Sequence, residues 1–146
     1  MGFIFLFQIL YISLYLTLIK TRKQMKPTKI LIVDDSPIDV LLLREYLKRL
    51  NFKREDILHS DTGNEGVALY KANPKQFKFI LMDVRLIGNL TGYETTSKLM
   101  KIYPIPIIIS SAQYKPEHPE SGYVGYLLKP YSKQHLFDLL TSLNLI

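Results

Sequence analysis

Short apolar runs alternate with amphipathic segments along most of the chain. Five runs have the length and composition of buried strands, and we predict strands at Lys29–Val33, Asp56–Ser60, Phe77–Met82, Ile105–Ile109 and Val124–Leu128. Apolar residues recur at helical spacing after four of these runs, which predicts helices over 37–49, 63–71, 91–102 and from 133 onward. Ser36, followed by Pro37, has the residue types of a helix N-terminus, and so does Ser132.

This order of elements predicts a single α/β domain over residues 25–146. Continuous apolar strands separated by helices are typical of a parallel sheet that is buried on both faces. We therefore expect a doubly wound (βα)5 sheet. The fourth helix is the exception, because segment 112–128 contains Pro116, Pro119 and Gly122, which oppose a regular helix. We expect this helix to be short or irregular.

Residues 1–24 form a separate hydrophobic N-terminal segment. Residues 3–19 contain no charged side chain, and only Gln8, Ser13 and Thr17 interrupt the apolar run. As a helix at about 1.5 Å per residue, the run would span roughly 26 Å, slightly less than a hydrocarbon core of about 30 Å. Basic residues follow it directly, and under the positive-inside rule they would hold the downstream domain in the cytoplasm. The segment is therefore a candidate membrane anchor.

A second interpretation of this segment stays open. Met25 begins the sequence MKPTKILIVDD, which is a natural start for a soluble domain, so residues 1–24 could lie upstream of the true start. A secretory signal peptide fits less well than either, because no basic residue precedes the apolar run and no small-residue cleavage site follows it.

Composition and charge exclude several classes of protein. Hydrophobic residues make up 47% and charged residues 22%, which excludes a disordered or collagen-like chain, and the absence of cysteine excludes disulfides and thiolate metal sites. The net charge of +6 is divided equally, because residues 1–24 carry three basic and no acidic side chains. A remainder of +3 on the domain is weak support for nucleic-acid binding, and we expect no direct nucleic-acid partner.

Reactive side chains follow four of the predicted strands. In chain order these are Asp34 and Asp35, then Asp83, then Ser110 and Ser111, then Lys129. In an open α/β sheet the carboxyl ends of the strands meet at the edge where ligands bind. Each residue alone could be an ordinary cap, turn or loop residue, but together they describe a site. Three close carboxylates need a cation, and Mg²⁺ prefers oxygen ligands. A carboxylate beside that ion can attack phosphorus and become an aspartyl phosphate.

The motifs at these positions resemble a known family. In order they read ILIVDDSPID, FILMDV, PIIISSA and GYLLKP, and they are similar to the response-regulator receiver domain of two-component signalling, over residues 29–146. The resemblance, with the chemotaxis-regulator type in particular, implies a flavodoxin-like sheet of strand order 2-1-3-4-5. It also implies a switch, not an ordinary enzyme, that catalyses only its own phosphorylation and dephosphorylation. The implied phosphodonor is a histidine kinase or a histidine phosphotransfer protein.

The resemblance assigns roles to single residues. It implies that Asp83 is the phosphoacceptor and that Lys129, in a cis peptide bond with Pro130, pairs with a phosphoryl oxygen. It implies a Mg²⁺ site made of Asp34, Asp35, Asp83 and the backbone carbonyl of Val84.

The resemblance also implies a pair of switch residues, Ser111 and Tyr126. Counting from Pro106 selects Ser111, not Ser110, as the hydroxyl that bonds the phosphoryl group. Both residues would move inward on phosphorylation and change the surface of the fourth helix, fifth strand and fifth helix. The segment between Ser111 and Lys129 is shorter than is usual in the family, which puts this output surface in question but not the phosphorylation chemistry.

Other functions account for fewer of these features. A degenerate receiver that serves only as a phosphorylation-independent interaction module is the main alternative, but all five key positions carry suitable residue types. A Mg²⁺-dependent phosphatase would need Asp-x-Asp, whereas Asp34 and Asp35 are adjacent. Neither common glycine-rich nucleotide-binding motif occurs in the sequence. The last predicted helix ends with the chain, so we expect a stand-alone receiver whose membrane contact, if any, is through residues 3–19.

Overall fold

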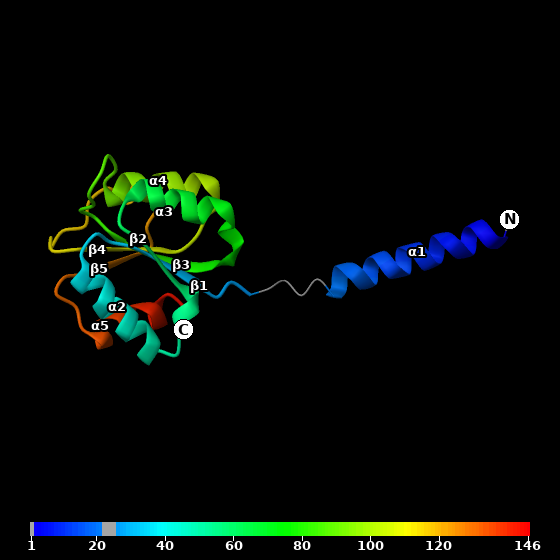
Figure 1. Cartoon of the computed structure of the whole chain (residues 1–146), viewed down its shortest axis with the longest axis horizontal. Coiled ribbons are helices and arrows are strands. Elements are labelled where there is room, and N and C mark those ends of the chain that lie inside the picture. Colours follow the sequence, from blue (N-terminus) through cyan, green and yellow to red (C-terminus); the bar gives the residue numbers. More distant parts are fainter. Residues whose placement is uncertain (1, 22–25) are drawn as a thin grey trace.

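The computed structural model describes residues 2–21 and 26–146, and residues 26–146 form a three-layered α/β domain (Figure 1). Five strands form one parallel sheet: β1 (Lys29–Val33), β2 (Ile57–Ser60), β3 (Phe77–Asp83), β4 (Ile107–Ser111) and β5 (Gly125–Leu128). Their order is β2-β1-β3-β4-β5, which confirms the predicted fold class and strand order. The predicted domain boundary between residues 24 and 25 lies outside the described residues.

Four α-helices cover the two faces of the sheet (Figure 1). Helices α2 (Pro37–Arg49) and α5 (Lys133–Ser142) pack on one face, and α3 (Gly63–Ala72) and α4 (Gly92–Ile102) pack on the other. All four start at a hydroxyl side chain that accepts a backbone N–H bond within the first turn, as for Ser36 from Asp39 at 3.3 Å. The sequence predicts two of these caps, Ser36 before α2 and Ser132 before α5.

Strand β4 begins and ends two residues later than the predicted range Ile105–Ile109. Pro106 has no N–H to donate, and its carbonyl accepts a bond from Ile80 N at 3.0 Å, so the regular strand starts after it. At the other end the ladder continues through both serines, because Ser111 O accepts from Lys129 N at 2.8 Å. Ser111 is therefore held by the sheet and is not part of a loop.

The segment between β4 and β5 contains no α-helix, and the structure describes all of it. Its only helical turn is the 3-10 helix η3 (Pro119–Ser121), which confirms the prediction of a short or irregular helix between the fourth and fifth strands. His118 before the turn and Gly122 after it both have left-handed backbone, with φ of 48° and 100°. The segment packs on α4 through Tyr93, whose hydroxyl accepts a bond from Glu117 N at 3.2 Å.

The hydrophobic core lies on both faces of the sheet and within residues 30–145. Alternate residues of β1 point to opposite faces: Ile30 and Ile32 join the α2 and α5 side, and Leu31 and Val33 join the α3 and α4 side. Every buried hydrophobic residue that the structure describes belongs to this domain. The domain's packing therefore does not depend on the N-terminal segment.

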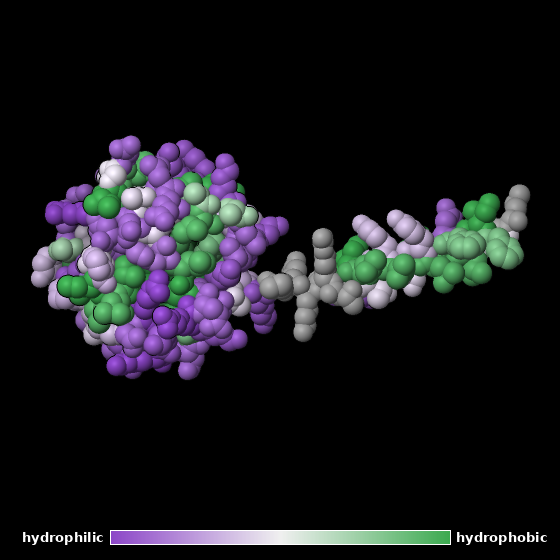
Figure 2. All heavy atoms as spheres, viewed as in Figure 1, coloured by the Kyte–Doolittle hydropathy of each residue, from purple (hydrophilic) through white to green (hydrophobic). Residues whose placement is uncertain are grey.

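The N-terminal segment forms the helix α1 (Gly2–Thr21), whose described side chains are exposed on all sides. Figure 2 shows apolar side chains along its length. By length and composition, Gly2–Lys20 could cross a membrane, a property that signal sequences near an N-terminus share.

Within the domain, two further short 3-10 helices, η1 (Arg54–Asp56) and η2 (Pro74–Gln76), precede β2 and β3.

Candidate functional site

Three carboxylates lie together at the carboxyl edge of the sheet. Asp34 and Asp35 follow β1 and Asp83 ends β3, and each offers an oxygen within 4.8 Å of the others. Because β1 and β3 are neighbours in the sheet, residues at their ends must meet, as the sequence predicts. Asp34 and Asp83 are buried and Asp35 is half-buried. Oxygen donors at this spacing suit a hard divalent cation such as Mg²⁺.

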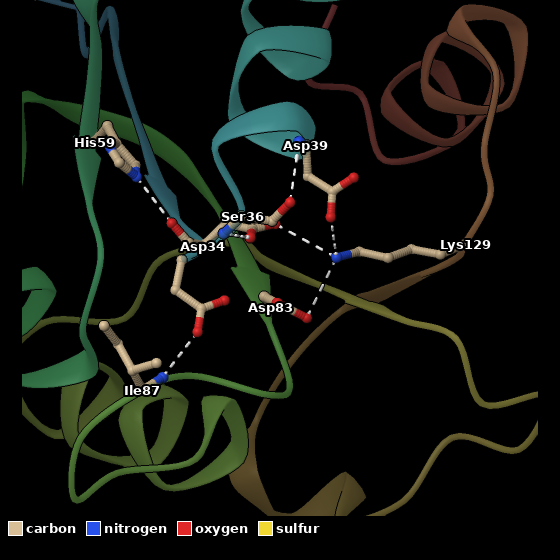
Figure 3. Close-up of polar contacts among 8 residues, drawn as sticks. Asp34, Ser36, Asp39, His59, Asp83, Ile87 and Lys129 are labelled. Atoms are coloured by element: carbon tan, nitrogen blue, oxygen red, sulfur yellow. Dashed lines mark hydrogen bonds and ion pairs between the residues drawn. The ribbon is translucent and has the colours of Figure 1, made fainter.

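Backbone amides and a histidine hold these acids in place (Figure 3). Asp34 Oδ1 accepts a bond from Ser36 N at 2.8 Å, so the turn into α2 fixes its orientation. Asp35 Oδ2 accepts from Ile87 N, in the loop after β3, at 3.0 Å. His59 Nε2 lies 2.8 Å from the Asp34 carbonyl oxygen and ties the end of β2 to the site.

Lys129 brings the end of β5 to the same site. Its Nζ lies 3.5 Å from Asp83 Oδ1, 3.4 Å from Asp34 Oδ2 and 2.8 Å from Asp39 Oδ2 (Figure 3). The predicted cis peptide bond between Lys129 and Pro130 is present. Asp39 is a site residue that the sequence analysis missed. Its position four residues after Asp35, in the first turn of a predicted helix, was the available signal.

Burial shifts the protonation of the site. Burial raises the pKa of Asp83 to about 6, while the Lys129 charge acts against this rise and the Asp34 charge adds to it. Burial likewise raises the pKa of Asp34, against a bond from Ser36 and the charge of Lys129. Burial lowers the pKa of Lys129. Its bond to Asp39 and the charges of Asp83 and Asp34 together raise this pKa by more than burial lowers it, so the net shift is upward. The carboxylates are thus costly to ionise together, and a cation would relieve that cost.

The backbone after Asp83 closes against α4. Val84 O accepts a bond from Gly92 N at 2.8 Å, which holds that carbonyl at the start of the helix. A Cβ atom at Gly92 would collide with the Asp83 carbonyl oxygen, so only glycine fits this approach. That the Val84 carbonyl supplies a metal ligand stays a prediction. The three carboxylates are the ligands of the proposed metal site.

Gln113 links the two predicted switch residues. Ser111 is buried, and its Oγ accepts a bond from Gln113 N at 3.1 Å. The half-buried Tyr126 donates from its hydroxyl to Gln113 O at 2.6 Å. Ser110, which the prediction did not select, lies opposite Asp83 in the β3–β4 register and is also buried. One backbone residue therefore contacts both members of the proposed pair.

The sequence matches the family described as "Response regulator receiver domain" over residues 30–141. The chain belongs to this family. Except for Lys29, the match covers all five strands, and it includes every site residue described above. A receiver is a signalling switch of two-component systems, not an ordinary enzyme.

Curated relatives of this receiver differ in length. It is 30% identical to protein PilH of Pseudomonas aeruginosa over 121 residues, which cover 78% of this chain and 95% of PilH. It is also 30% identical to the transcriptional regulatory protein ResD of Bacillus subtilis over 117 residues, 77% of this chain and 46% of ResD. The peroxide stress-activated histidine kinase mak3 of Schizosaccharomyces pombe is 27% identical over 123 residues, only 5% of its length.

Solved structures show the same fold for this receiver. The CheX–CheY complex with BeF₃ and magnesium from Borrelia burgdorferi has a TM-score of 0.74 at 23% identity, covering 81% of this chain and 90% of that one. The receiver domain of the sensor histidine kinase PA1611 from Pseudomonas aeruginosa has a TM-score of 0.68 at 25% identity, covering 79% and 95%. That domain was crystallised with a magnesium ion coordinated in its active-site cleft.

Proposed function

We propose that this receiver accepts a phosphoryl group on the Asp83 carboxylate from a histidine kinase or a histidine phosphotransfer protein. The observation that carries the proposal is the set of three carboxylates within 4.8 Å of one another, with Lys129 Nζ 3.5 Å from Asp83. We further propose that Asp34, Asp35 and Asp83 hold a Mg²⁺ ion. The receiver relative solved with magnesium in its cleft supports this assignment.

Each residue has a defined part in the transfer. An Asp83 oxygen forms the new bond to phosphorus, and the bond from phosphorus to the donor nitrogen breaks. Bound Mg²⁺ would neutralise charge on the carboxylates and on the transferring oxygens. Lys129, already directed into the site, would pair with a phosphoryl oxygen in place of Asp83 Oδ1. Ser111 would turn its hydroxyl from Gln113 N to the phosphoryl group.

The test is incubation of the full chain, in detergent, with acetyl phosphate and Mg²⁺, followed by intact-mass spectrometry. We expect the mass of one added phosphoryl group, lost when Mg²⁺ is chelated and absent in Asp83→Asn. Asp138→Asn is the matched control, because Asp138 is an exposed acid on α5 that accepts a bond from Gln134 and lies outside the site. An unmodified chain that takes up no phosphoryl group would favour the interaction-module alternative.

We also propose that α1 anchors the receiver to the inner face of a membrane, with residues 1–24 as the anchor and 25–146 as the cytoplasmic domain. Support comes from the apolar composition and length of Gly2–Lys20, which is exposed throughout, and from Lys20 at its end. Fractionation of C-terminally tagged protein from its native cell tests this. A membrane-bound product that contains residues 1–24 is expected, and a soluble product that begins at Met25 would contradict the anchor.

A further inference from the structure

Basic side chains gather at the edge of the sheet where the strands begin. The helices run opposite to the strands, so the last turns of α2, α3 and α4 reach this same edge. We name it the lysine edge, and it comprises Lys26, Lys29, Lys48, Arg49, Lys53, Arg54, Lys71, Lys75, Lys78 and Lys101. The acids in these same segments are Glu45, which pairs with Lys48, and Glu55 and Asp56 in η1.

Acidic side chains gather at the opposite edge, around the phosphoacceptor. That edge carries Asp34, Asp35, Asp39, Asp61, Glu65, Asp83 and Glu94 at strand ends and in first helical turns. Lys129 and Lys133 lie at this edge as well, but its acids outnumber its bases, so charge is distributed unevenly along the strands although the net charge of the domain is small. Because β1 has only five residues, at about 3.3 Å each, the two edges are roughly 15 Å apart along this strand.

The centre of the lysine edge is a cleft of about 790 Å³. Lys26, Lys29, Lys75 and Lys78 line it, together with Tyr103. Among the described residues, none of these four lysines forms an ion pair with a carboxylate, so their charge is uncompensated. Tyr103 is 45% exposed, with Lys75 Nζ 5.9 Å from its ring centroid. Lysines beside an exposed tyrosine suit the interfacial region of a bilayer.

Chain connectivity places this cleft close to the end of α1. Thr21 ends the helix, and Lys26 is five residues further along. Five residues reach at most about 18 Å when fully extended, at about 3.6 Å per residue. Salt at physiological ionic strength screens the attraction between exposed charges over a length of about 8 Å. If α1 crosses a bilayer, the lysine edge thus stays within about two screening lengths of the headgroups.

We propose that the lysine edge docks on the anionic lipid surface of the membrane that α1 enters, so that the Asp83 edge faces the cytoplasm. The proposal rests on the membrane anchor proposed above. Basic clusters directly beside a spanning helix bind anionic headgroups. Docking would present the phosphoacceptor to a soluble phosphodonor, since that edge is directed away from the bilayer. A nucleic acid is the less favoured occupant, because the first lysine of the cleft, Lys26, follows the apolar helix by only five residues along the chain.

The test uses the full chain in lipid nanodiscs made of phosphatidylcholine alone or of phosphatidylcholine mixed with phosphatidylserine. An amine-reactive reagent modifies exposed lysines, and mass spectrometry reports the extent at each one. We expect several-fold less modification of Lys26, Lys29, Lys75 and Lys78 in the anionic discs, reversed by high salt. Lys133, exposed at the opposite edge, is the internal control and is expected to react equally in both.

A double variant, Lys75→Gln with Lys78→Gln, should abolish the lipid-dependent protection of Lys26 and Lys29, whereas Lys133→Gln should retain it. Equal modification of the cleft lysines in the two discs would overturn the docking, while incorporation into neutral discs would still support the anchor. A chain that enters neither disc would overturn the anchor and the docking that rests on it. Equal protection by duplex RNA, added to neutral discs, would overturn the assignment to lipid.

Discussion

Lys129 donates its shortest contact in the site to Asp39, at 2.8 Å, and not to the proposed phosphoacceptor Asp83, at 3.5 Å. The ammonium group thus lies between the first turn of α2 and the end of β3. It is shared among three carboxylates, one of which, Asp39, lies outside the proposed metal site. Asp39 therefore competes with Asp83 for the positive charge that a phosphoryl group would use.

Asp39→Asn should lower the pKa of Asp83. The substitution removes a negative charge from the site and lets Lys129 approach Asp83 more closely, and both changes favour the ionised form of Asp83. Titration of side-chain carboxyl carbons by NMR, without metal, measures this pKa directly. Asp138→Asn is the control and should leave it unchanged. An Asp83 pKa that rises in Asp39→Asn would contradict the competition.

Asp83→Asn should stabilise the metal-free protein at neutral pH. Burial raises the pKa of Asp83 to about 6 from 3.8, so the folded protein binds this proton more tightly than the unfolded chain. The free energy of unfolding therefore falls as pH rises through this interval, by about 3 kcal/mol for a shift of roughly two pKa units. Removing the charge should recover about 1–3 kcal/mol at pH 7 in urea titrations. Saturating Mg²⁺ should shrink the difference, and a variant less stable than the parent would show the account of burial to be wrong.

Gly92→Ala should destabilise the domain and disturb the site. Its Cβ atom would meet the Asp83 carbonyl oxygen, a backbone atom that cannot move without shifting β3. Overpacking of this kind costs about 1–3 kcal/mol. Thermal unfolding in detergent gives the change, and Gly2→Ala, with no atom within 4 Å of the added methyl group, is the neutral comparison. Equal stability of the two variants would show that the α4 start can relax.

Ser111→Ala should uncouple Tyr126 from the proposed phosphoacceptor, Asp83. We expect beryllofluoride with Mg²⁺ to draw Ser111 Oγ from Gln113 N and to release the Tyr126 bond to Gln113 O. The ring resonances of Tyr126 should then shift in the parent and not in Ser111→Ala. Ser110→Ala is a matched control, since Ser110 is as buried and lies next to Ser111 in β4. A shift that is lost in Ser110→Ala and kept in Ser111→Ala would reassign the switch hydroxyl.

Most of the fold follows from local pattern. Buried parallel strands are apolar throughout, and hydroxyl caps mark the helix starts, so β1 and α2 end within a residue of their predicted limits. The predicted start of β4 was wrong because it rested on apolar character alone. That criterion takes no account of Pro106, which has no N–H group to donate to the neighbouring strand. The irregular segment before β5 was foreseeable from its prolines and glycine.

The site was predictable only in part. Asp34, Asp35, Asp83 and Lys129 follow strands, and the topology of a parallel sheet brings such positions together. Asp39 lies within a helix, and its approach to Lys129 depends on how α2 packs. The link from Gln113 to both Ser111 and Tyr126 uses backbone groups, which no residue type reveals.

The most direct test of the central claim locates the phosphoryl group itself. The full chain is phosphorylated with acetyl phosphate and Mg²⁺ and treated with borohydride, which reduces an aspartyl phosphate to homoserine, and its peptides are sequenced by mass spectrometry. Homoserine at position 83, and at no other acid, is the predicted result. Homoserine at position 34 or 35 would contradict the assignment of Asp83 as the phosphoacceptor. So would the absence of any homoserine from a chain that had taken up a phosphoryl group.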